Sequence, residues 1–128
     1  MAIYLLDTSV IIDVLNQKRG RWQLLAALVE DGDTLACSAV TLTEIYAGMR
    51  PKELANTERF LDGLDHYGLD SQLARDAGLL KNEWAKKGRT LGVVDLIIAA
   101  TALAHHLVLM TDNRKDFPMP QLALYPLP

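Results

Sequence analysis

Several acidic residues lie where carboxylates are rarely tolerated, within or directly after apolar segments. The chain has 16 Asp and Glu residues, and most of them fall in polar stretches. The exceptions interrupt or follow apolar runs, and they are Asp7, Glu44, Asp95, Asp112 and Asp116. Burying one carboxylate is costly unless it is paired, and several gathered together would repel one another. A divalent cation resolves both problems, and a set of carboxylates without His or Cys favours the hard ions Mg²⁺ and Mn²⁺.

Each of these acids also has a purely structural interpretation. Asp7 could cap the helix that follows it, and Thr41 with Glu44 matches a capping box, in which the Glu side chain bonds back to the Thr amide. Asp95 could cap the buried helix in which it lies, although residues just before it are equally well placed. One such acid alone is weak support for a site, but their joint occurrence at one edge of a sheet favours a functional group.

Asp112 and Asp116 compete for the last position in this group. Asp112 directly follows a predicted strand, and its direction depends on a two-residue alternation that a strand apolar on both faces does not reveal. Asp116 precedes Phe117, and one helical turn begun near Asn113 would swing the Asp116 side chain back toward the strand ends. Alternatively, Asp112 and Asn113 could form only a turn, and Asp116 could be only a helix cap.

The elements that must position these acids alternate between strand-like and helix-like patterns. Strands are predicted over residues 2–6, 34–40 and 107–110, with an edge strand over 122–125 in a proline-rich tail. Helices are predicted from Thr8 or Ser9 to about Asn16, from Thr41 to before Pro51, and over 22–30, 51–64, 71–87 and 93–106. This alternation predicts a single α/β domain, 1–128, with a mostly parallel central sheet and helices on both faces. In such sheets, ligands bind beyond the carboxyl ends of the strands.

Composition places the chain among ordinary globular domains. It has 128 residues, 50% of them apolar and 23% charged. The single cysteine, Cys37, excludes a disulfide framework and a cysteine zinc site. We see no secretory leader and no membrane span, so we expect a soluble cytoplasmic protein. The net charge of −3 does not indicate a general nucleic-acid binder, so any site for a polyanion must be local.

Four segments, taken in order, resemble the acidic motifs of PIN-domain ribonucleases. Residues 5–12 (LLDTSVII) resemble the opening motif, in which a strand ends in Asp followed by Thr or Ser. Residues 43–45 (TEI), followed by Gly48, resemble the second motif, and residues 94–100 (VDLIIAA) the third. Residues 109–117 (LMTDNRKDF) resemble the last. The match spans the whole chain, and a domain-length chain of this kind resembles the VapC toxins of type II toxin–antitoxin pairs.

The resemblance implies a three-layer PIN-like fold and an endoribonuclease that uses Mg²⁺ or Mn²⁺ to hydrolyse RNA phosphodiester bonds. It also implies a homodimer and a VapB-like antitoxin partner, a segment of which would cover an apolar groove. The implied catalytic and metal-site residues are Asp7, Glu44, Asp95 and Asp116, with Asp112 as the alternate. The residues implied to position the metal, its water or the acids are Thr8, Thr111 and Asn113.

Basic residues stand close to the acids along the sequence, and they have two interpretations. The clusters are Lys18, Arg19 and Arg21; Lys86, Lys87 and Arg89; and Arg114 and Lys115. They could contact RNA phosphates, although two lysines before Gly88 are also typical of a helix C-terminus. We assign no catalytic role to the histidines, which we expect to be structural or on the surface: His66, His105 and His106.

Two functions of other classes are compatible with an α/β chain of this length. A receiver-like signalling module would share the parallel strands and an Asp at a strand end. It also needs an early acidic pair and a Lys after a later strand, whereas here Asp7 stands alone and Asp112 follows the strand 107–110. The other alternative is a catalytically silent interaction domain. Metal-dependent RNA cleavage separates both from a nuclease.

Overall fold

A five-stranded parallel sheet forms the centre of the protein in a computed structural model of residues 1–128. The strands lie in the order β3-β2-β1-β4-β5, and every neighbouring pair is parallel. Their bounds are β1 Ile3–Leu6, β2 Thr34–Ser38, β3 Asp65–Tyr67, β4 Val108–Met110 and β5 Ala123–Leu124. The helices are α1 Thr8–Leu15, α2 Arg21–Glu30, α3 Ala39–Gly48, α4 Leu54–Asp62, α5 Ser71–Lys86 and α6 Val93–His105, with short 3₁₀ turns η1 Pro51–Glu53 and η2 Arg114–Asp116.

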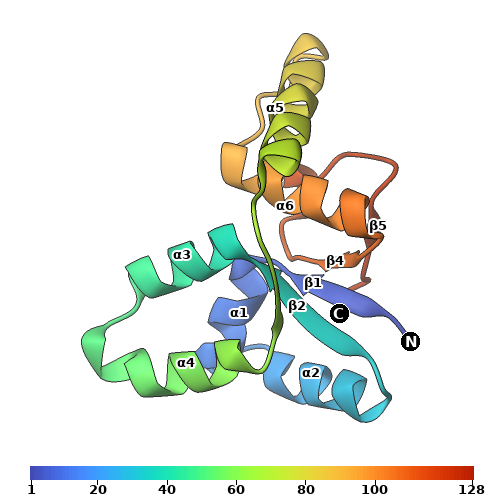
Figure 1. Cartoon of the computed structure of the whole chain (residues 1–128). Coiled ribbons are helices and arrows are strands. Elements are labelled where there is room, and N and C mark those ends of the chain that lie inside the picture. The colour runs from blue at the N-terminus through green and yellow to red at the C-terminus, as the bar shows by residue number, and fades with distance from the viewer.

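Helices cover both faces of this sheet, as the sequence predicted. Figure 1 shows α1, α2 and α4 on one side of the strands and α5 and α6 on the other. Successive strand residues point to opposite faces, so each buried strand contributes to two cores. Leu5 and Leu109 pack with α5 and α6, whereas their neighbours Leu6 and Met110 pack with α1, α2 and α4. No helix combines the length and the apolar character needed to cross a membrane.

The carboxyl ends of the central strands meet at one edge of the sheet, because the strands run in the same direction. Asp7 follows β1, and its backbone N–H donates to the carbonyl of Met110, the last residue of β4. Ser38 ends β2 and caps α3 by accepting from the amide of Val40. Residues that follow β1, β2 and β4 are therefore brought together although they are far apart in the sequence.

The structure decides two helix caps that the sequence left open. Of the candidates Asp7, Thr8 and Ser9, Asp7 is the N-cap of α1, because its side chain accepts from the Thr8 amide. Strand β2 stops at Ser38 and not at residue 40, and α3 begins at Ala39. Thr41 therefore lies inside α3 and is fully buried. The capping box that Thr41 and Glu44 could have formed does not exist, which frees the Glu44 carboxylate for other contacts.

Other differences concern polar or irregular segments. The helix predicted over 51–64 is divided into η1 and α4 and ends at Asp62, before a tight approach to β3. Strand β3 was not predicted, because its sequence Asp-His-Tyr lacks apolar alternation and it pairs only along one edge. Strand β5 lies at the opposite edge of the sheet, which is where a proline-rich segment can pair.

Candidate active site

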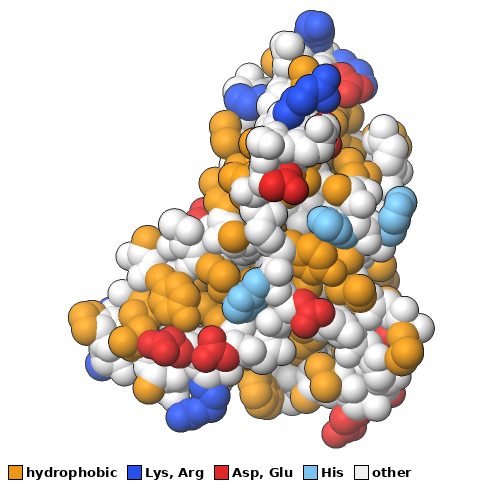
Figure 2. Space-filling model, in the orientation of Figure 1, with side chains coloured by type: hydrophobic (Ala, Val, Ile, Leu, Met, Phe, Trp, Pro, Cys, Tyr) orange, Lys and Arg blue, Asp and Glu red, His pale blue; other side chains and the backbone are white.

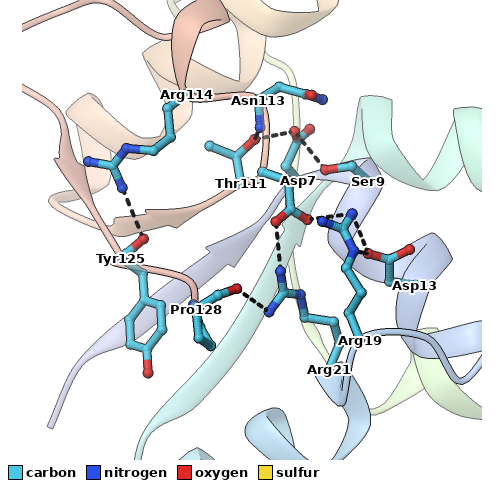
Figure 3. Close-up of polar contacts among 11 residues, drawn as sticks. Asp7, Ser9, Asp13, Arg19, Arg21, Thr111, Asn113, Arg114, Tyr125 and Pro128 are labelled. Carbon is cyan, nitrogen blue, oxygen red and sulfur yellow. Dashed lines mark hydrogen bonds and ion pairs between the residues drawn. The ribbon is translucent and has the colours of Figure 1, made fainter.

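Asp7 has a structural role and also faces the group of acids. Its side chain is buried, with 4% of its surface exposed. The Oδ1 atom accepts from the Thr8 amide at 2.8 Å, and this bond caps α1. The Oδ2 atom accepts from the Thr111 hydroxyl at 2.6 Å and from the Ser9 hydroxyl at 3.3 Å (Figure 3). Both oxygens are thus oriented by neutral donors, and none of these donors neutralises the charge.

Burial raises the pKa of Asp7, and the charge of Glu44 adds to this rise. The hydrogen bonds from Thr111, Thr8 and Ser9 act in the opposite direction, because they favour the ionised carboxylate. The net direction is upward, so desolvation outweighs three hydrogen bonds. Asp7 is therefore a carboxylate that the fold holds in place at an energetic cost.

Asp95 shows most clearly that the acids are grouped. It lies in the first turn of α6, whose N-cap, Gly92, makes no side-chain cap. Burial raises the pKa of Asp95 to about 6, and the charges of Asp7, Asp116 and Glu44 contribute to the rise in that order. The three other acids of the predicted group are thus close enough to act on Asp95 electrostatically.

Glu44 reaches the group from α3 across the sheet edge. Its Oε1 atom accepts from the Thr8 hydroxyl at 2.6 Å, and the same hydroxyl lies 3.4 Å from the Thr41 hydroxyl. Thr8 therefore joins the starts of α1 and α3. Glu44 therefore accepts a hydrogen bond from a neutral hydroxyl and has no cationic partner. Asp7 is in the same situation, with Thr111 as its donor.

Asp116 and Asp112 point to different surroundings. Asp116 closes η2, is half-buried, and precedes Phe117, of which 2% is exposed. Asp112 instead pairs with Arg21, its Oδ1 atom lying 2.7 Å from the guanidinium, and with Arg19 at 3.3 Å. The charge of Asp116 acts on Asp95, whereas Asp112 has its own cations.

Of the predicted supporting residues, Thr8 and Thr111 donate directly to the acids and Asn113 supports through its backbone. The Asn113 amide donates to the Thr111 hydroxyl oxygen at 3.0 Å. This bond orients the hydroxyl that in turn donates to Asp7. The Asn113 side chain itself is exposed and makes no hydrogen bond within the chain.

The donor chemistry of this group suits a hard divalent cation. None of Asp7, Glu44, Asp95 and Asp116 forms an ion pair with a basic side chain. No three acidic, His or Cys side chains converge closely enough to hold one ion in the present conformation. Glu44 is exposed, and Asp95 and Asp116 are half-buried, so their side chains can change rotamer and converge on an ion. Uncompensated negative charge on oxygen atoms alone is the setting that Mg²⁺ and Mn²⁺ favour.

Sequence reasoning missed the importance of Arg21. It was grouped with Lys18 and Arg19 as a basic cluster, and nothing in its neighbours indicates burial. In the structure it is 1% exposed and is among the largest fully buried side chains. The sequence prediction began this helix at residue 22, whereas in the structure Arg21 is the first residue of α2, where a basic residue is unfavourable to the helix dipole.

The remaining basic and histidine residues lie outside the acidic group. Arg89 donates to the carbonyl of Lys115 at 2.5 Å, which ties the loop before α6 to η2. The ring of His105 packs against Tyr67 with centroids 4.6 Å apart. A ring nitrogen of His66 lies 2.8 Å from the carbonyl of Leu61. These contacts agree with the expected structural or surface role of the histidines.

Comparison with known proteins identifies the family. The model of the PIN domain matches residues 4–119. The chain belongs to the PIN domain family. Among its curated relatives is Ribonuclease VapC19 of Mycobacterium tuberculosis, with 34% identity over 90% of this chain and 92% of that protein. Another is the tRNA(fMet)-specific endonuclease VapC of Shigella flexneri, with 29% identity over 91% of each chain.

A solved structure supports the same assignment of fold. The crystal structure of VapBC2 from Rickettsia felis, bound to a DNA fragment from their promoter, contains a chain that aligns with this PIN domain at a TM-score of 0.85. The two are 27% identical, and the alignment covers 96% of this chain and 97% of that one. The family resemblance and the three-layer parallel fold predicted from the motifs are both confirmed.

The raised pKa of Asp95 predicts how the stability of the metal-free PIN domain depends on pH. Since the pKa lies above its ordinary value of 3.8, at about 6, folding favours the protonated form. The stability contributed by this proton is present below pH 3.8 and is lost as pH rises to about 6. Asp95→Asn removes the repelled charge, so in chelator it should raise the melting temperature at about pH 7.5 and change it little at about pH 3.5.

Thermal unfolding followed by circular dichroism checks this expectation, with the exposed Asp65→Asn in β3 as a matched control. The control should shift the melting temperature by similar small amounts at both pH values. A lower melting temperature for Asp95→Asn at neutral pH would show instead that the Asp95 carboxylate holds the fold together.

Proposed function

We propose that this PIN domain is a metal-dependent endoribonuclease and the toxin of a VapBC-type toxin–antitoxin pair. The observation that carries the proposal is the group of four acids, unpaired with any base, at the carboxyl edge of a parallel sheet. The names of its relatives, a ribonuclease and an endonuclease of the VapC type, support RNA as the substrate. Similar solved structures, of VapBC2 from Rickettsia felis and of a toxin–antitoxin complex from Klebsiella pneumoniae, support an antitoxin as the partner.

Asp7, Glu44, Asp95 and Asp116 would hold Mg²⁺ or Mn²⁺ in this proposal. When bound, the ion lowers the pKa of water and offsets the negative charge that builds on the phosphodiester during hydrolysis. The Thr111 hydroxyl orients the Asp7 carboxylate, and the Thr8 hydroxyl orients that of Glu44. These donors hold the acids in place and leave their charge available to a cation.

Asp116 is our choice for the fourth acid. Asp112 is paired with two arginines, so recruiting its carboxylate would leave the buried Arg21 without a counter-charge. Asp116 has no such partner, and its charge acts on Asp95. Phe117, buried in the core below η2, anchors the turn that presents Asp116.

Exposed basic side chains outside the acidic group suit contacts with RNA phosphates. Arg89 and Lys115 meet beside η2 through the bond from the Arg89 guanidinium to the Lys115 carbonyl. The Lys115 side chain is exposed, as are Lys86 and Lys87. Figure 2 shows Lys and Arg side chains gathered at the far end of α5. Local positive charge of this kind lets a chain with a net charge of −3 bind a polyanion.

RNA cleavage across a Mg²⁺ series tests the site. Asp7→Asn and Asp116→Asn keep the side-chain shape and remove a charge that would hold the ion, so both should lose activity, and more at limiting than at saturating Mg²⁺. Asp112→Asn is the matched control: any loss it causes should persist at saturating Mg²⁺. Full activity of both Asp7→Asn and Asp116→Asn would refute the site. If only Asp112→Asn depends on Mg²⁺, the fourth acid is Asp112.

An apolar groove on the α1–α2–α4 face suits the antitoxin. Its volume is about 800 Å³. Trp22, 54% exposed, and Phe60 stand across it with ring centroids 6.4 Å apart. Arg59 contributes a cation to its lining. We propose that an amphipathic antitoxin segment lies here, with an apolar face against the aromatic pair and an acidic residue toward Arg59. The other lining residues are Val14, Leu15, Gln17, Gln23, Leu25, Ala26, Val29, Leu35, Asn56, Gly63 and Leu64.

Trp22→Ala tests this groove. Exposed aromatic side chains that become buried on binding often contribute about 2 kcal/mol or more, roughly a 30-fold change in Kd. Trp22→Ala should therefore weaken binding of the cognate antitoxin by that order, measured by calorimetry. Leu69→Ala removes an equally exposed apolar side chain, 46% exposed, outside the groove and should leave the Kd unchanged. Equal affinities for both variants would place the antitoxin elsewhere.

The homodimer implied by the family resemblance has a candidate surface on the opposite face of the sheet. A hollow between α5 and α6 is lined by Leu79, Leu80, Ala100, Leu103 and Ala104, with Asp76 and Glu83 beside them. Leu79 is 51% exposed in the single chain. A second copy of the chain, packed about a two-fold axis, would bury this apolar face.

Light scattering at micromolar concentration tests the dimer. The unmodified chain should have the mass of two copies, and Leu79→Glu should reduce it to one by burying an unpaired charge. The exposed Leu54→Glu in α4 serves as control and should not change the mass. A strict monomer for the unmodified chain would exclude the dimer.

A further inference from the structure

A buried ion pair lies beside the segment that carries Thr111 and Asp116. Arg21, the first residue of α2, is almost fully buried, yet it carries a permanent charge. One guanidinium nitrogen lies 2.7 Å from Asp112. Another contacts the carbonyl of Pro128 at 3.5 Å, as Figure 3 shows. Its Nε atom has no hydrogen-bond partner. A buried charge with one close counter-charge depends strongly on it, because losing either partner leaves the other desolvated and alone.

The chain that carries Asp112 also carries part of the acidic site. Thr111, the preceding residue, donates to Asp7, and Asp112 turns the other way toward Arg21. The following residue, Asn113, donates its amide to the Thr111 hydroxyl and begins the turn that ends at Asp116. The segment between β4 and η2 is thus held by Asp112 on one side and by Thr111 on the other.

The loop that delivers Arg21 is strained. Gln17 and Arg19 adopt positive φ angles of 54° and 55°, which are uncommon for residues other than Gly. Asp13, buried in α1, holds this loop through two close contacts with Arg19, at 2.9 and 2.8 Å. Arg19 then reaches Asp112 at 3.3 Å. Such backbone conformations persist where the surroundings over-determine them, and here the surroundings are a network of opposite charges.

We propose that Arg21 and Asp112 form a positioning pair that aligns Thr111 and Asp116 with Asp7, and that Asp112 is not a metal ligand. The inference rests on the proposed nuclease function of the acidic group. Arg21 supplies the counter-charge that turns Asp112 away from the acids. The pair thereby keeps a fifth carboxylate out of the acidic group. It also fixes the position of the segment between β4 and η2 relative to the sheet edge. Neither residue touches the substrate.

A double-mutant cycle on the purified chain tests the pair. The variants are Arg21→Met, Asp112→Asn and the two combined, with RNA cleavage, Mg²⁺ affinity by calorimetry and amide exchange of residues 111–117 as readouts. We expect each single variant to lower kcat by about 10- to 100-fold, since small displacements of reacting groups have effects of that order. KM and the Mg²⁺ Kd should change by less than about threefold, and exchange of the segment should accelerate. The combined variant should be no worse than the more damaged single one, because both changes break one interaction.

Two further variants separate positioning from general stability. Leu61→Ala creates a cavity in the core under α4, which carries none of the acids, and should lower the melting temperature while leaving kcat and exchange at 111–117 unchanged below the transition. Arg21→Lys keeps the charge and should recover part of the lost kcat. It also provides a folded variant if Arg21→Met does not fold, and the cycle is then run with Arg21→Lys.

The outcomes that would overturn the pair are distinct from those that would overturn the nuclease. Independent, additive losses in the cycle, with a weaker Mg²⁺ Kd for Asp112→Asn alone, would make Asp112 a ligand. The pair would be merely structural if kcat were unchanged in both Arg21→Met and Arg21→Lys. The same would follow if Leu61→Ala lowered kcat as much as these variants at an equal loss of melting temperature. If the unmodified chain cleaves no RNA with Mg²⁺ or Mn²⁺, the proposed function fails, and amide exchange at 111–117 still decides whether the pair positions the segment.

Discussion

Repulsion among carboxylates gathered at one edge of a parallel sheet is the constraint on which the rest of this structure depends. Asp7, Glu44, Asp95 and Asp116 come from four different elements, and the pKa of Asp95 rises partly because the other three surround it. No basic side chain pairs with any of them. The apolar cores on both faces of the sheet must therefore hold together an arrangement that electrostatics alone would disperse.

Neutral hydrogen-bond donors orient the acids, and the nearby arginine side chains pair with other groups, so the negative charge of the acids is not cancelled. The hydroxyls of Thr8 and Thr111 orient Glu44 and Asp7, and neither acid forms an ion pair. Arginines lie close by, but they are engaged elsewhere: Arg21 with Asp112, and the Arg89 guanidinium with a backbone carbonyl. The charge at the centre thus stays available to a divalent cation, which is the property that the proposed ribonuclease requires.

The start of α2 connects two regions that serve different proposed purposes. Arg21 is buried and contacts the segment that leads to the acids, whereas the next residue, Trp22, is exposed on the groove proposed for the antitoxin. Consecutive helical residues point in directions about 100° apart, so one turn of helix can serve an interior ion pair and a binding surface at once. The α5–α6 face proposed for the dimer lies across the sheet from that groove (Figure 1).

The sequence by itself determined the fold class and most element bounds and singled out the candidate acids, because these depend on local signals. Apolar periodicity predicted the strands and helices, and an acid such as Asp95 inside an apolar helix has few structural explanations. The tertiary structure alone decided the pairing of the polar strand β3 and the direction of Asp112. Each of these depends on a partner distant in the sequence. Asp112 and Arg21 are 91 positions apart, and a strand apolar on both faces carries no sign of which way its following residue turns.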